Sequence, residues 1–403
     1  MRPPRNWNSV SVGDCCSIKH GYPFESACMS PDATRGPVVV SIGNFRYTGG
    51  FRFGETSIKR LVGDVPVSYK LAPGSILLAM TCQTPDGEIL GIPGAIPNDG
   101  EVYLHNQRMG LVLPKQGTEI DTGFLFYLFC TKAFNKHLVE RATGTKVKHT
   151  SPSTIESFVF PRPPLPEQRK IANILSTWDE ALEKLDALIA AKERRKKALM
   201  QQLLTGQRRL PGCRTKWAHV HLKDVANESM RRNRTKLDRA RLYAVTKAEG
   251  MVPMREQVQG ATIDRCKIVE QGWFAYNPMR INIGSIARWM EAAPVMVSPD
   301  YVVFHTDERR LLSDYLNHVR RTALWSSFVG GAGNGSVRVR IWFDDLGHLK
   351  LHLPPVSEQR AIADVLDTVD VELRFLRNQR TALDQQKRGL MQQLLTGKVR
   401  VPA

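Results

Sequence analysis

The chain has 403 residues, and its 57 lysines and arginines exceed its 39 aspartates and glutamates by 18. This length predicts two or three domains, and so large a basic excess favours a polyanionic partner, most often a nucleic acid, over an ordinary enzyme. The most apolar run, Phe124–Cys130, is far too short to span a bilayer, and residues 1–7 lack the apolar stretch of a signal peptide. We therefore expect a soluble, cytoplasmic protein without a membrane partner.

The seven cysteines form no Cys-x-x-Cys pair, which is typical of reduced intracellular thiols. Cys15, His20 and Cys28 could in principle hold a metal ion. Their spacing is irregular and no second pair of ligands follows, so the sequence predicts no metal site.

Residues 1–163 are expected to form a first globular head. Short apolar runs separated by Gly and Pro predict strands at 38–42, 75–80, 102–104, 110–113 and 158–160. Residues 120–140 are predicted to form one helix, with Asp121 or Thr122 as its cap. A basic loop around Gly144 follows this helix.

Residues 164–206 are predicted to form one long helix. Pro166 suits the first turn, where a missing N–H costs nothing, and Gly206 is a C-terminal stop signal. Apolar residues alternate at spacings of three and four, the period of a coiled coil. The predicted seam consists of Ile171, Leu175, Trp178, Leu182, Leu185, Ile189, Leu199 and Leu203, interrupted by Lys192 and Lys196.

The same pattern returns in the second half of the chain, as a head at 207–354, a helix at 355–397 and a tail at 398–403. Glu167-Gln168-Arg169 recurs as Glu358-Gln359-Arg360, and Met200–Gly206 recurs as Met391–Gly397, both 191 positions later. The second seam consists of Ile362, Leu366, Val369, Leu373, Leu376, Leu383, Leu390 and Leu394, interrupted by Arg380 and Lys387. Within the second head, 311–328 is predicted to be a helix.

Two helices of equal length with matching seams are expected to pack on each other, although two separate surface helices remain the alternative. Because the second helix starts from the second head, an antiparallel pair with the heads at opposite ends is favoured. The predicted fold is therefore α+β: two mixed α/β heads separated by a two-helix antiparallel coiled coil, related by a pseudo-two-fold axis.

Catalytic motifs are not found. The stretch Asn277–Arg280 lacks the second proline and the aromatic residue of an amino-methyltransferase loop. Gly331-Ala-Gly333 follows a predicted helix and has Ser336 where a dinucleotide-binding loop needs Gly. Pro299-Asp300 with Glu308 only loosely resembles a nuclease motif. We expect no catalytic residues in this chain.

Candidate DNA-binding residues are those whose side chains can pair with base edges or hold phosphates near predicted turns. In the first head they are Asn44, Arg46, Tyr47, Lys59, Arg60, Asn106, Gln107, Arg108, Thr145, Lys146, Lys148 and His149. In the second head they are Arg231, Arg232, Asn233, Arg234, Lys236, Arg280, Asn282, Arg288, Asn334, Ser336, Arg338 and Arg340. For each one alone, a solvated surface side chain is the competing interpretation. The favoured segments are the run 231–234 and two Gly loops, one around Gly144 and one at 330–335, which correspond at the 191-residue offset.

The segments 163–172 and 354–363, each containing Glu-Gln-Arg, and the two Met-Gln-Gln-Leu-Leu-Thr-Gly ends resemble the specificity (S) subunits of type I restriction-modification systems. This resemblance implies that each head is a target recognition domain reading one half of a split site in double-stranded DNA. It implies that the helices set the spacing and dock two methyltransferase (modification) subunits, which restriction or translocase subunits can join. S-adenosylmethionine, with ATP and Mg²⁺ where a restriction subunit joins, is then expected on the partners. The alternative is a non-DNA coiled-coil adaptor that bridges two proteins.

Overall fold

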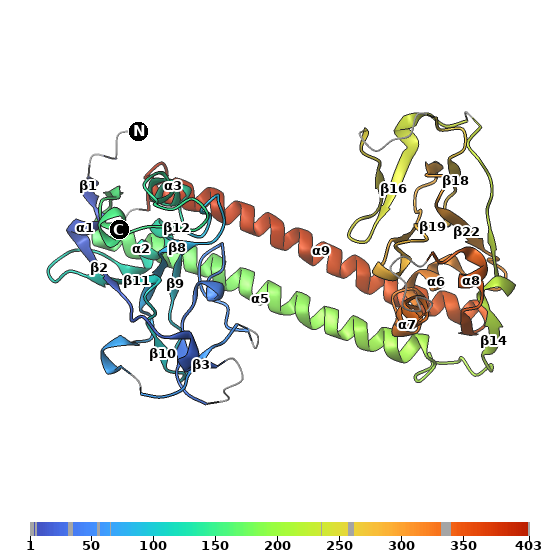
Figure 1. Ribbon diagram of the computed structural model, residues 1–403, viewed down its shortest axis with the longest axis horizontal. Coiled ribbons are helices and arrows are strands. Elements are labelled where there is room, and N and C mark those ends of the chain that lie inside the picture. The colour runs from blue at the N-terminus through green and yellow to red at the C-terminus, as the bar shows by residue number, and fades with distance from the viewer. Residues whose placement is uncertain are drawn as a thin grey trace. The chain divides into compact units, whose positions relative to one another are not determined.

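The computed structural model describes residues 4, 6–30, 35–54, 57–64, 66–234, 236–256, 262–331 and 340–401 (Figure 1). The chain divides into two compact units, Met1–Leu185 with Gln379–Ala403 and Asp186–Asn378. Each unit contains one head and parts of two long helices, α5 (Leu165–Leu204) and α9 (Val356–Leu395). In the described part of the chain, no helix joins the length and the apolar composition that crossing a membrane requires.

The long helices follow the predicted segments 164–206 and 355–397 closely. Pro166 and Ser357 lie in their first turns, and Gly206 and Gly397 follow their last turns with φ of 73° and 70°. At such left-handed φ values glycine is favoured, because an L side chain would be strained there.

The two helices run antiparallel within each unit. In the second unit, Lys192 of α5 forms an ion pair with Glu372 of α9, and Lys196 forms one with Asp370. A later residue of α5 thus faces an earlier residue of α9, which is the mark of an antiparallel pair. In the first unit, Ile171 and Leu175 share a core with Leu394 and Leu395, and Lys387 pairs with Asp179 farther along. Every predicted seam position is buried or half-buried. The lysines that interrupt the seam are thus satisfied by acidic residues of the facing helix.

Within its described residues, the first head combines four groups of strands. The first and last strands of the head, β1 (Asn8–Ser11) and β13 (Val159–Arg162), pair antiparallel. A four-stranded sheet has the order β2 (Cys16–His20), β11 (Met109–Pro114), β7 (Ile76–Ala79), β9 (Pro93–Ala95). A five-stranded sheet has the order β3 (Met29–Ser30), β5 (Arg60–Leu61), β4 (Val38–Val39), β10 (Tyr103–Leu104), β6 (Lys70–Leu71). A short pair, β8 (Thr81–Cys82) and β12 (Lys148–His149), completes it.

The second head follows the same plan. Its first and last strands, β14 (Ala218–His221) and β23 (Lys350–Leu353), pair antiparallel. One sheet has the order β15 (Ala226–Glu228), β22 (Val302–Thr306), β19 (Phe274–Tyr276), β20 (Ile286–Arg288). The other has the order β17 (Gly250–Pro253), β16 (Leu242–Thr246), β21 (Val295–Val297), β18 (Lys267–Val269).

The single helices predicted at 120–140 and 311–328 are wrong, because each is two helices. They are α2 (Thr122–Phe129) with α3 (Lys132–Glu140), and α6 (Ser313–Val319) with α7 (Ala323–Gly331). At both breaks a threonine hydroxyl donates to a carbonyl three residues earlier, Thr131 to Leu128 at 2.7 Å and Thr322 to Val319 at 2.6 Å. A hydroxyl that replaces a helical N–H donor favours such a break. The two threonines are 191 positions apart, so the break belongs to the repeat.

Each head is fused to the ends of the two long helices. In the first unit, the sheet and helix residues pack with the start of α5 and the end of α9. In the second unit, Leu203 from the end of α5 and Ile362 and Leu366 from the start of α9 join the core of the head. Such shared apolar packing fixes how each helix end leaves its own head. Two short helices, α4 (Pro152–Glu156) and α8 (Phe343–Gly347), immediately precede the last strand of each head.

Candidate nucleic-acid interface

An equivalent locus lies at the carboxyl end of the central strand in each head, β7 in the first and β19 in the second. In the first head, the Thr150 amide donates to the Met80 carbonyl at 3.0 Å. In the second, the Ile341 amide donates to the Pro278 carbonyl at 3.0 Å. Thr150 and Ile341 are 191 positions apart, so the same chain crossing is repeated. We call these two loci the strand-end sites.

The strand-end site of the first head gathers residues that are far apart in the sequence. The Met80 amide donates to the carbonyl of Arg108, and His149 pairs with Thr81, whose hydroxyl lies 3.2 Å from His149 Nδ1. The side chains of Gln107, Arg108, Thr145, Lys146 and His149 are exposed, and those of Asn106 and Lys148 are half-buried. The structure thus brings together seven of the predicted candidates.

Gly144 is required by the turn that leads into this site. Its φ is +93°, and a Cβ there would lie 2.1 Å from the carbonyl oxygen of Val147. Only glycine fits so close an approach. Residues 145–148, which include Lys146 and Lys148, are therefore held in a tight turn that ends at His149, rather than in an extended loop.

The strand-end site of the second head contains Arg280, Asn282 and Arg340, all exposed. The loop 277–283 leaves β19, and Arg340 directly precedes Ile341, which bonds to that loop. Arg340 and His149 occupy corresponding positions, since they precede the two residues of the repeated crossing. Three of the predicted candidates therefore meet at this site.

The apolar residues of this second site were not predicted from the sequence. Met279, Ile283 and Trp342 are 45%, 54% and 44% exposed, although residues of these types usually prefer the interior. Exposed aromatic and basic side chains together are typical of surfaces on which bases stack. The tryptophan two positions after a predicted arginine was the available signal. Lys247, exposed at the β16–β17 turn, was also missed; its side chain lies beside Gly284.

Several predicted residues lie away from the strand-end sites. Tyr47 is exposed at the tip of a turn, and Lys59 is exposed beside β5. A guanidinium nitrogen of Arg46 lies 3.9 Å from a carboxylate oxygen of Glu183 in α5. In the second head, the segment 231–234 runs along β18: Arg232 forms an antiparallel β-bridge with Lys267, and the side chain of Arg231 forms an ion pair with Glu270. Arg232, Arg234 and Lys236 are exposed there.

Four predicted residues serve local structure instead, because burial or an ion pair occupies their polar groups. They are Asn44, Asn233, Arg60 and Arg288. Fully buried Asn44 accepts from the Ser41 amide and donates to the Ser57 carbonyl, and fully buried Asn233 bonds twice to Leu237. Arg60 forms a two-point pair with Glu101, and Arg288, whose side chain is only 6% exposed, pairs with Asp314.

The remaining candidates, Asn334, Ser336 and Arg338, lie outside the described residues. The predicted correspondence between the loop 330–335 and the loop around Gly144 lies there in large part as well.

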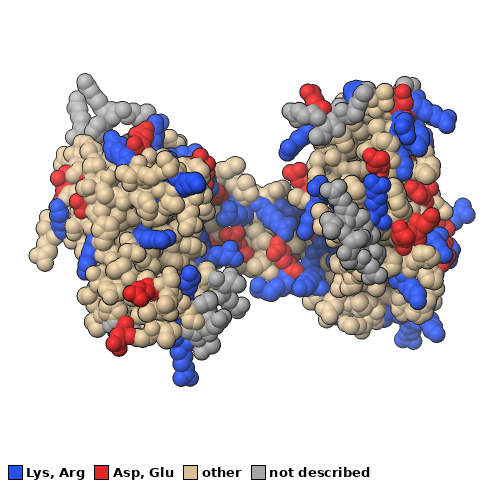
Figure 2. All heavy atoms as spheres, viewed as in Figure 1, with Lys and Arg blue, Asp and Glu red and all other residues tan. Residues whose placement is uncertain are grey.

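Basic side chains are spread over both units. Figure 2 shows Lys and Arg interspersed with Asp and Glu on the visible face of each unit, not collected in one patch. On this face the distribution of charge does not mark an interface, and the strand-end sites are identified by their geometry.

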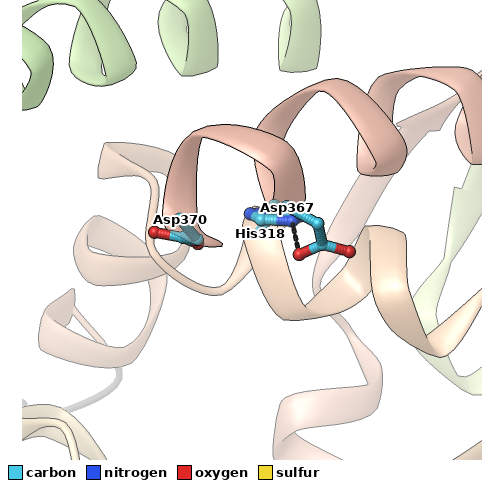
Figure 3. Close-up of side chains that lie close together, drawn as sticks. All are labelled: His318, Asp367 and Asp370. Carbon is cyan, nitrogen blue, oxygen red and sulfur yellow. Dashed lines mark hydrogen bonds and ion pairs between the residues drawn. The ribbon is translucent and has the colours of Figure 1, made fainter. Parts of the chain in front are cut away.

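A buried polar cluster joins α6 to α9 in the second unit. His318 is fully buried, and its Nε2 lies 2.9 Å from Oδ1 of Asp367, while Asp370 lies on the other side of the imidazole (Figure 3). Burial lowers the pKa of His318 although Asp367 opposes this effect. Asp370 is already paired with Lys196 and Arg321. A cation would have to displace both, so this cluster is a contact between helices and not a metal centre.

A family model described as the type I restriction modification DNA specificity domain matches residues 4–192. The chain is 24% identical to the type I restriction enzyme MjaX specificity subunit of Methanocaldococcus jannaschii over 371 residues, which cover 83% of this chain and 80% of that protein. It is 22% identical to the type I restriction enzyme MjaVIII specificity subunit of the same organism over 339 residues, which cover 75% of this chain and 77% of that protein.

Two solved structures share the fold. The type I restriction-modification S subunit from M. genitalium superposes with a TM-score of 0.62 at 14% identity, over 98% of this chain and 99% of that one. A chain from a study of complex assembly and conformational transition in a type I restriction-modification system superposes with a TM-score of 0.56 at 17% identity. The match covers 99% of this chain and 100% of that one. Together with the duplicated head and helix, the family-model match and the two relatives support a specificity subunit of a type I restriction-modification system.

Proposed function

We propose that this chain supplies the DNA sequence specificity of a type I restriction-modification complex, with each head reading one half of a bipartite site. The observation that carries the proposal is the pair of strand-end sites, which occupy the same place in two heads but present different side chains. The first offers Arg108, Lys148 and His149. The second offers Arg280, Arg340 and Trp342. Two heads with the same fold but different exposed side chains at this site are suited to reading two different half-sites.

The strand-end sites are proposed as the base-reading surfaces because their side chains come from chain crossings fixed by backbone hydrogen bonds. Arg, Asn and Gln can pair with base edges, and a rigid origin allows such contacts to be specific. The exposed residues Arg231, Arg232, Arg234 and Lys236, together with Lys59 and Arg46, are proposed to contact phosphates, which position a protein without reading sequence.

The proposed domain limits are 1–163 and 207–354 for the two heads and 164–206 and 355–397 for the two helices. The helices are proposed to act as the spacer between the heads. They would set the separation of the half-sites and dock two methyltransferase subunits, which restriction or translocase subunits can join. We propose that this chain is not catalytic. S-adenosylmethionine, and ATP with Mg²⁺ where a restriction subunit joins, would then bind to the partners.

The test is a head exchange in the assembled methyltransferase complex. Residues 207–354 are replaced by the corresponding head of another specificity subunit, and methylated sites are mapped by sequencing. The expected result is a new sequence in one half-site, with the other half and the gap retained. Unchanged methylation sites would refute the proposal.

A further inference from the structure

Three histidines lie on the two strands that open and close the second head. In the β14–β23 pair, His219 lies directly opposite His352, and His221 lies opposite Lys350. Side chains two residues apart on a strand share a face. His219, His221, His352 and Lys350 therefore project from the same face, while Val220, Leu351 and Leu353 on the other face pack into the core.

This histidine face is absent from the otherwise equivalent strand pair of the first head. There, Ser9, Ser11 and Pro161 occupy the positions of His219, His221 and His352 in β1 and β13. The capping contact is kept in both heads: the Ser11 amide donates to Asp14 at 2.7 Å, and the His221 amide donates to Asp224 at 2.8 Å. The folding of the strand pair therefore does not require imidazoles.

The imidazoles are accessible and close together. His219 and His352 are exposed, and their ring centroids are 4.3 Å apart at an interplanar angle of 3°. The buried ring of Trp217 meets the His352 ring edge-on, with the ring centroids 5.2 Å apart. Nδ1 of the half-buried His221 lies 3.7 Å from Oδ2 of Asp224. With its proton on Nδ1, toward this carboxylate, His221 can offer Nε2 as the ligand atom.

We propose that His219, His221 and His352 form a binding site for a late first-row divalent cation, for which Zn²⁺ is the probe. Two histidines on one strand and a third on the neighbouring strand provide three neutral nitrogen ligands. Imidazole suits Zn, Cu and Ni, and three protein ligands leave one position for water. Asp224 would orient His221 from behind, as carboxylates commonly do for metal-bound histidines.

Binding changes the arrangement of the rings in a defined way. A metal ion lies in the plane of each imidazole that binds it, so the parallel rings of His219 and His352 must tilt toward a common point. Both side chains are exposed, so their rings can rotate, and the rotation of His352 changes its edge contact with Trp217. Lys350 completes the four-residue face, and its exposed ammonium group must swing away from the ion. The bound ion would link the first strand of the head to the last.

The test measures Zn²⁺ binding to the full chain, free of any affinity tag, by competition with a chromogenic chelator. The expected result is one site that is lost in His219→Gln and in His352→Gln. Asp224→Asn should weaken it about tenfold. Lys350→His should tighten it, because a fourth imidazole replaces a repelling ammonium. His348→Gln is the matched control, since this exposed histidine precedes β23 and should leave binding unchanged.

Thermal unfolding gives a second readout, because an ion that binds only the folded state raises the melting temperature. Zn²⁺ should stabilise the wild type and the Lys350→His variant but not His219→Gln. Without Zn²⁺, the wild type, His219→Gln and Lys350→His should melt together, which shows that these substitutions leave the fold intact. If His219→Gln and His352→Gln bind Zn²⁺ as the wild type does, or if binding is lost only in His318→Gln, the proposal is wrong. Should a glutamine variant misfold, unchanged affinity in Lys350→His would still refute it.

Discussion

Arg400 donates two hydrogen bonds to the buried carboxylate of Glu167, at 2.7 and 2.8 Å, across a sequence separation of 233 residues. The indole of Trp7 donates to the same carboxylate at 3.1 Å, and the Arg400 guanidinium lies 5.4 Å from the Trp7 ring centroid. Burial acts to raise the pKa of Glu167, but the bonds from Arg400 and Trp7 outweigh it and lower that pKa. This triad ties the end of α9 to the start of α5 and to the first strand of the head.

The second unit contains the same triad in Arg209, Glu358 and Trp217. Arg209 bonds to Glu358 at 2.6 and 2.7 Å, and Trp217 donates to it at 3.2 Å. Each arginine follows the end of one long helix and binds a glutamate in the first turn of the other. In an antiparallel pair the end of each helix lies beside the start of the other, and these two arginine–glutamate contacts fit that arrangement.

We expect Arg400→Met to destabilise the first unit by about 2–4 kcal/mol, because it leaves the buried Glu167 carboxylate without its charged partner. Urea unfolding at pH 7 measures the change. Lys398→Met, at an exposed position two residues earlier, is the matched control and should change stability by less than about 0.5 kcal/mol. Adding Glu167→Gln to Arg400→Met should recover part of the loss. Equal effects of Arg400→Met and Lys398→Met would contradict the role of the triad.

The ion pairs between the long helices should differ in strength with their exposure. Lys196 is 14% exposed and faces Asp370, which is also bonded to Arg321, whereas Lys192 is 23% exposed and faces the more open Glu372. Charge reversal should therefore cost more in Lys196→Glu, about 2 kcal/mol or more, than in Lys192→Glu, about 1 kcal/mol. Chemical denaturation of both variants tests the order. The reverse order would show that the pairs do not hold the helix register as described.

The strand-end site of the second head should contribute to DNA affinity. Arg340→Ala in the assembled complex should either weaken binding by about 1–3 kcal/mol with relaxed specificity at one base, or reduce the salt slope by about 1. Arg309→Ala is the control: this exposed arginine follows β22, which runs antiparallel to β19, so it lies at the other end of the sheet. Binding measured from 50 to 200 mM salt distinguishes the outcomes. Identical affinities and slopes for Arg340→Ala, Arg309→Ala and the wild type would exclude Arg340 from the interface.

The stability of the first head should fall in mild acid because of His105. Its side chain is 1% exposed, and burial lowers its pKa to about 4, although its bond to the Met109 carbonyl at 2.9 Å opposes the shift. The unfolded chain has a histidine pKa of about 6.5, so between pH 6.5 and 4 it binds the proton more readily than the folded chain. The stabilisation is therefore complete above pH 6.5 and decreases as the pH falls, by about 2 kcal/mol at pH 5.

Urea unfolding at pH 7 and pH 5 measures this loss. The variant His105→Gln keeps a donor for the Met109 carbonyl but cannot be protonated, so its stability should depend less on pH. If the variant and the wild type lose stability equally, His105 is not the titrating group.

The sequence by itself determined the architecture of repeated heads and helices. The seams, the helix ends at Gly206 and Gly397, and the repeat of Glu-Gln-Arg all depend on local propensity and periodicity, which are visible without a fold. The exact 191-residue offset also predicted which positions correspond, and the triads of Glu167 and Glu358 follow it. The basic loop after Gly144 was recognised from glycine and charge alone.

Only the tertiary structure decided which polar residues are available to a ligand. Asn44, Asn233 and Arg288 have suitable side chains, but their partners at Ser57, Leu237 and Asp314 become neighbours only after folding. Likewise, His149 reaches Thr81, and His219 reaches His352, through strand pairings between segments far apart in the chain. Burial and strand register arise from contacts between distant segments, so a sequence read along its length predicts the elements but not the surfaces that they form together.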